Sequence, residues 1–97
     1  MFSVANVKPR YFEFQQPGGD NVLKIEPPKL KTMRELEEVD DDDRKLIEVV
    51  AKIIAKNTAG FRVTPEMVES WLDVDQLVEF ITAFMDWLRA ERKADPN

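Results

Sequence analysis

The chain of 97 residues contains no cysteine and no histidine. Without cysteine there are no disulfide bonds, zinc–thiolate sites or thiol nucleophiles, a composition that fits a reducing cytosol. Without histidine the chain lacks the side chain that most often acts as a general base or metal ligand. We therefore predict that the protein is not an enzyme and has no catalytic, metal-binding or cofactor-binding residues.

Long apolar runs are also missing. The first ten residues, MFSVANVKPR, lack the continuous apolar stretch of a signal peptide. Glu48 and Lys52 interrupt the most apolar segment, so no stretch approaches the roughly eighteen apolar residues of a membrane span. We expect a protein that stays in the compartment where it is made, with no membrane partner.

Positive charge is sparse. The formal net charge is -5, and the basic residues of the front half are scattered rather than clustered. Such a balance repels a phosphate backbone, because no segregated basic patch offsets it. We expect no nucleic-acid partner.

The first structured element that the sequence indicates is a β-hairpin over about 10–26. The turn signal PGGD at 17–20 separates two β-prone runs. If these four residues form the loop, Phe14 lies opposite Leu23 and Phe12 opposite Ile25. All four side chains then point to one face, which must pack on another element.

Helical patterns fill 29–92. Leu30, Met33 and Leu36 recur at helical spacing and predict a short first helix. The aspartates at 40–43 precede a second helix that ends near residue 57, where they would cap N–H groups and complement the helix dipole. A cation site is the alternative, but the D-x-D-x-D-G spacing and distal glutamate of a calcium loop are missing.

The second helix carries apolar residues over an arc of about 160°, which predicts a central helix covered on more than one side. Thr64 and Pro65 mark the start of a third helix. Asp73 caps a fourth, with Gln76 completing a capping-box pair, and this helix runs to about residue 92. The predicted fold is a single α+β domain over 1–97, helix-dominant, with the hairpin packed on a bundle of about four short helices. Residues 1–8 and 93–97 are predicted to be flexible.

The last helix has an apolar arc of about half its circumference, wider than a surface helix needs. We expect Leu77, Ile81, Phe84 and Leu88 near the centre of this arc, Val78 and Met85 on one edge, and Phe80 and Trp87 on the other. Either the hairpin and second helix cover the whole arc, or the Phe80/Trp87 edge stays exposed and binds a partner. Aromatic residues are enriched at binding hot spots, so the candidate partner-binding residues are Phe80, Trp87, Phe84, Trp71 and Met67.

Two other functions fit parts of the sequence. A small acidic regulatory or inhibitor protein, bound to a host protein, would use the carboxylates. A helix-turn-helix DNA binder would use the two helices joined at Asp73, but the polar face of the second one carries Asp75, Glu79 and Asp86. Those carboxylates would meet phosphates, which disfavours DNA binding.

The order of features resembles a known family over about 22–88. The segments PPKLKTMREL, DDDDRKLIEVVAKII and TPEMVESWLDVDQLVEFITAFMDWL follow a hairpin. The layout and rhythm of the last segment resemble the small tail assembly chaperones of long-tailed bacteriophages and prophages.

This resemblance implies a non-enzymatic chaperone in the cytoplasm of the bacterial host, absent from the mature virion. The implied partners are the tape measure protein and the tail tube protein, whose subunits the chaperone helps to recruit. The resemblance also allows self-association. Apolar capture of a helical client by the exposed edge of the last helix is the mechanism that we expect.

Overall fold

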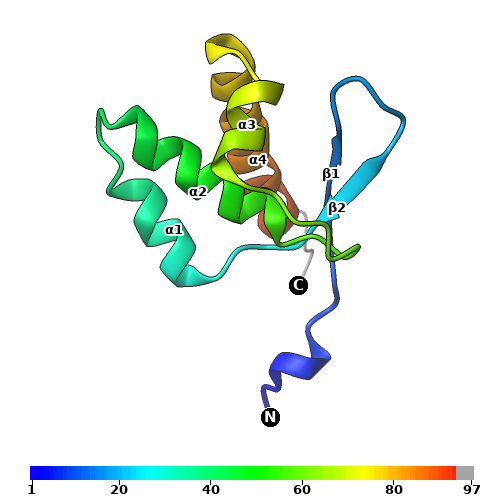
Figure 1. Cartoon of the computed structure of the whole chain (residues 1–97). Coiled ribbons are helices and arrows are strands. Elements are labelled where there is room, and N and C mark those ends of the chain that lie inside the picture. Colours follow the sequence, from blue (N-terminus) through cyan, green and yellow to red (C-terminus); the bar gives the residue numbers. More distant parts are fainter. Residues whose placement is uncertain (94–97) are drawn as a thin grey trace.

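The computed structural model describes residues 1–93, with side chains described through residue 90. Over this range the chain forms an N-terminal hairpin followed by four helices, and the hairpin lies to one side of the helices (Figure 1). The predicted helix-dominant α+β fold is confirmed.

The hairpin consists of β1 (Phe12–Gln15) and β2 (Val22–Ile25), paired antiparallel. Phe12 pairs with Ile25 and Phe14 with Leu23, so the predicted register is confirmed. Gly18 has a φ of 76°, a conformation that glycine adopts without strain, and it follows Pro17 in the turn.

The first two helices are α1 (Leu30–Glu37) and α2 (Asp43–Ala55). Asp42 is the N-cap of α2 and accepts a hydrogen bond from the backbone N–H of Lys45 at 3.1 Å. Asp43 lies in the first turn, where its charge complements the helix dipole. The capping role predicted for this aspartate run is therefore confirmed for Asp42.

Helix α2 is the central helix of the fold. It contacts α1, α3 and β2, and the side chains buried along it are Val49, Val50, Ala51, Ile53 and Ile54. A stripe that faces several neighbours must be wide, which is why the apolar arc of this helix exceeds that of a surface helix.

The loop after α2 pairs with β2 through backbone hydrogen bonds. Ile25 forms an antiparallel bridge with Asn57. On either side of it, Glu26 N–H donates to the Lys56 carbonyl at 2.8 Å and Thr58 N–H to the Lys24 carbonyl at 3.0 Å. These bonds fix the hairpin to the end of α2, and nothing in the sequence pattern predicts them.

The last two helices are α3 (Pro65–Trp71) and α4 (Val74–Lys93). The Thr64 hydroxyl accepts a hydrogen bond from Met67 N–H at 3.2 Å, with proline at the first turn. Asp73 and Gln76 form the predicted reciprocal pair at the start of α4, with distances of 2.7 and 2.9 Å. Both predicted helix starts are confirmed.

Aromatic rings join the hairpin to α4. Phe12 contacts Phe84 edge-to-face with ring centroids 5.4 Å apart, and Phe14 contacts Phe80 in the same way at 5.6 Å. Edge-to-face pairs of this kind add about 0.5–1.5 kcal/mol each to the burial of the rings. The hairpin, marginal alone, is thus anchored on the last helix.

The chain before the hairpin runs away from the helices and contains a short 3-10 helix, η1 (Val4–Asn6) (Figure 1). Phe2, Val4 and Val7 are exposed there. At the other end, Lys93 is the last residue of α4, and the rest of the segment predicted to be flexible lies outside the described residues.

Candidate functional site: an apolar groove between α2, α3 and α4

The structure shows which edge of the wide apolar arc of α4 is buried. Phe84 is 1% exposed and Phe80 is 8% exposed, whereas Val78 on the opposite edge is 56% exposed. Val74, one turn earlier, is 76% exposed. Of the two alternatives that the sequence leaves open, the one in which Phe80 stays exposed is therefore not the one that the structure shows.

The reason lies in the partners that the hairpin supplies. Phe12 and Phe14 face α4, where the ring of Phe80 contacts both of them and the ring of Phe84 contacts Phe12. When half of a helix surface is apolar, the pattern alone does not determine which part is buried. The part that is buried depends on which neighbouring side chains pack best against the helix. Here the aromatic edge packs on the hairpin, and on the other edge Val78 faces outward while Met85 is half-buried.

The five residues predicted to bind a partner are all at least half-buried in the fold. Phe80 and Phe84 are buried, while Trp71, Trp87 and Met67 are half-buried. Trp71 contacts Phe14 with ring centroids 6.0 Å apart, and Trp87 contacts Phe84 at 5.5 Å. None of the five lines the groove described next.

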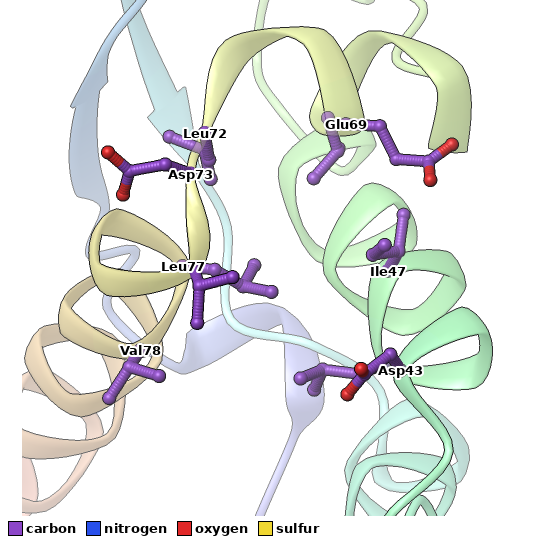
Figure 2. A pocket seen from close by; sticks show the side chains of 10 residues that line it. Asp43, Ile47, Glu69, Leu72, Asp73, Leu77 and Val78 are labelled. Atoms are coloured by element: carbon purple, nitrogen blue, oxygen red, sulfur yellow. The ribbon is translucent and has the colours of Figure 1, made fainter.

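An open groove of about 400 Å³ lies between α2, α3 and α4. Figure 2 shows Leu77 and Val78 of α4 across the opening from Ile47 and Asp43 of α2, with Glu69 of α3 beside it. The aliphatic side chains that line it are Leu46, Ile47, Val68, Leu72, Val74, Leu77 and Val78. It is a predominantly apolar surface that the folded chain leaves open.

The floor and the wall of the groove differ in burial. Val68 is fully buried, and Leu46, Ile47, Leu72 and Leu77 are half-buried against the core. Val74 and Val78, four residues apart, lie on the same face of α4 and form the exposed wall. The wide apolar arc of α4 was the only sequence signal for this wall.

Carboxylates line the α2 and α3 side of the groove. Asp43 and Glu69 line both the groove and an adjoining depression between α2 and α3, to which Glu48 and Glu66 also contribute. Arg44 is the one basic residue in the lining of these two surfaces within the described part of the chain. All three helices contribute aliphatic side chains to the groove, and α2 and α3 add the carboxylates of Asp43 and Glu69.

Asp73 also lines the groove, at the junction of α3 and α4. Its carboxylate is engaged with the N–H of Gln76 and therefore serves the helix start. Among the side chains that the structure describes, neither Asp43 nor Glu69 forms an ion pair, so both charges face solvent. The acidic side is thus available to an incoming cation.

The lining of the groove combines aliphatic side chains with carboxylates. Among the side chains described through residue 90, no cluster of three or more acidic residues is arranged to hold a metal ion. Within residues 1–93, none of the helices combines the length and apolar surface needed to traverse a bilayer. What the groove offers is an apolar floor and wall with charge along one side.

No protein-family model matches the chain, and comparison with curated proteins and with solved structures gives no match either.

Proposed function

We propose that the protein is a non-enzymatic binding protein that holds an apolar segment of a client in the α2–α3–α4 groove. The observation that carries this proposal is the pair Val74 and Val78, which stay 76% and 56% exposed beside an apolar floor. Contiguous apolar surface on a small domain is typical of an interaction site.

The resemblance to phage tail assembly chaperones supplies the identity of the client. On that basis we propose that the protein acts in the cytoplasm of a bacterial host, where it keeps the tape measure protein soluble and helps to recruit tail tube subunits. We place the proposed binding site in the groove on the other edge of α4 and not on the Phe80/Trp87 edge, because Phe80 is buried.

Coexpression with the tape measure protein of the same gene cluster tests this function. We expect a larger soluble fraction of the client in the presence of the protein. The double variant V74S/V78S should abolish the gain, because it removes two exposed apolar side chains without changing the charge. A client that is equally soluble without this protein would overturn the proposal.

The matched control is Val22→Ser. Val22 is 50% exposed on β2 and does not line the groove, so this variant makes the same chemical change on another surface. It should keep the client soluble. Equal loss from V22S and from V74S/V78S would mean that the groove is not the site.

A second candidate function is an acidic regulatory protein that binds a host protein. The carboxylates of Asp43, Glu48, Glu66 and Glu69 along α2 and α3 favour it. Binding by charge alone weakens steeply with salt and survives the loss of the valines. Client binding that persists at high salt but fails in V74S/V78S would exclude this candidate.

A further inference from the structure

We propose that the groove takes a basic amphipathic helix, seated with its apolar stripe on the floor and with lysine or arginine on one flank. This inference rests on the proposed function, since it names the chemistry of the client segment that the same groove binds. The occupant is a helix of another protein, and the orientation of its charges follows from the two unlike sides of the groove.

Aliphatic side chains from all three helices line the groove. Ile47 on α2 and Leu77 on α4 lie on opposite sides of the groove, with Val68 buried between the helices. An apolar groove lined by helices suits a helix that contributes side chains at i, i+3/i+4 and i+7. The exposed Val74 and Val78 then pack on the flank of that stripe.

The two walls of the groove differ in the carboxylates that they present. The α4 wall presents Val74 and Val78, and Asp73 at its start already accepts the Gln76 N–H. The α2/α3 wall presents the carboxylates of Asp43 and Glu69 beside its aliphatic residues, with Glu66 in the adjoining depression. A helix with cations on both flanks would place one row against the valines and desolvate it without a partner. A helix with cations on one flank places them beside the carboxylates and its uncharged flank beside the valines. Its binding is then steered by charge.

The acidic wall also excludes some occupants. A helix with glutamate on the flank that meets Asp43 and Glu69 places like charges together, which costs affinity. An uncharged apolar helix gains nothing from the carboxylates. The groove therefore discriminates among amphipathic helices by the sign of the charge on one flank.

The test uses three synthetic helical peptides of eighteen residues with the same leucine stripe. The first carries lysine on one flank, the second glutamate at the same positions, and the third lysine on both flanks. Binding to the full chain is followed by fluorescence anisotropy from 50 to 500 mM NaCl, values chosen to span a large change in charge screening. We expect the first peptide to bind at least about tenfold more tightly than the second at low salt, and the difference to shrink with salt.

Two protein variants separate the two halves of the proposal. D43N/E69Q removes two charges with little change of shape and should weaken binding of the first peptide about fivefold at low salt and little at high salt. V74S/V78S should weaken it at least about tenfold at every salt concentration. The matched control E13Q/D20N removes two exposed charges from the hairpin and should leave binding unchanged.

Failure of this inference is distinct from failure of the proposed function. Suppose that D43N/E69Q binds all three peptides as the natural chain does. If this variant also keeps the client soluble and V74S/V78S does not, the groove is a client site without charge selection, and the inference is overturned. If V74S/V78S keeps the client soluble, the proposed function itself fails. If the chain alone associates with rising concentration in sedimentation velocity and V74S/V78S prevents this, a second copy occupies the groove, which also overturns the inference.

Discussion

The guanidinium carbon of Arg10 lies 4.3 Å from the centroid of the Trp87 ring, although 77 residues separate the two in sequence. The same guanidinium donates to the backbone carbonyls of Trp87 and Leu88 at 3.3 and 3.4 Å. This contact fixes the start of the hairpin to the second half of α4, and it covers the aromatic ring that the sequence left as a candidate for a partner.

Replacing Arg10 by alanine should lower the free energy of unfolding by about 1–2 kcal/mol, since a cation–π contact and partly buried hydrogen bonds are lost together. Arg10→Lys should recover less than half of this loss, because an ammonium cannot form the planar fork over the ring. Urea unfolding followed by far-UV circular dichroism gives the values. Arg62→Ala, an exposed arginine on a loop, is the control and should change stability by less than about 0.5 kcal/mol. An R10A loss no greater than that of the control would contradict the prediction.

The two edges of α4 should differ sharply in their contribution to stability. Phe80→Ala leaves a cavity among three rings, those of Phe12, Phe14 and Phe84, and should cost about 3–4 kcal/mol. Val78→Ala, two residues away, should cost less than about 0.5 kcal/mol, because the side chain is already exposed. Urea denaturation with an unchanged slope measures both values. A V78A loss comparable to that of F80A would show that the aliphatic edge is covered in solution.

Local features of this fold could be predicted from the sequence because their partners are close in the chain. The position of the turn fixes the register of the hairpin, and only that register puts four apolar side chains on one face: Phe12, Phe14, Leu23 and Ile25. Helix starts at 64 and 73 depend on bonds spanning three residues, and the capping residue types identify them.

The rotation of α4 about its axis could not be predicted in this way. Its apolar arc is wide enough to bury either edge, and the outcome depends on how Phe12 and Phe14 meet it. The sequence leaves open whether the whole arc is covered or the Phe80/Trp87 edge is exposed, whereas the structure exposes Val74 and Val78. The groove needs three helices to be in position before it exists, and no spacing along the chain encodes it.

Asn57 is a polar residue buried to 7% exposure in the loop that follows α2. Its amide nitrogen donates to the carbonyls of Ile54 and Phe61, each at 2.9 Å, and its oxygen accepts from Phe61 N–H at 2.9 Å. Asn57→Ala leaves these backbone groups without partners and should cost about 2–3 kcal/mol. The loop also pairs with β2, so hydrogen exchange at the Glu26 and Thr58 amides should accelerate in the variant.

The control for this prediction is Asn21→Ala on the exposed hairpin loop. Asn21 donates to the side chain of Gln16 at 3.4 Å, a long and solvent-accessible bond. Its loss should change stability by less than about 0.5 kcal/mol. If N57A is as stable as N21A, water replaces the amide of Asn57 and the loop does not depend on it.

Asp73 should stabilise α4 through its hydrogen bond rather than through its charge. Its carboxylate accepts from Gln76 N–H at 2.7 Å, and its own N–H donates to the Gln76 side chain at 2.9 Å. Asp73→Ala should cost about 1 kcal/mol, while Asp73→Asn, which keeps an accepting oxygen, should cost only a few tenths. Asp75→Asn removes a first-turn charge that makes no cap and should also cost a few tenths. Thermal and urea unfolding of the three variants in low and high salt separate the two effects, since salt screens the charge but not the cap. A D73N loss equal to that of D73A would mean that charge, and not the capping bond, sets the start of this helix.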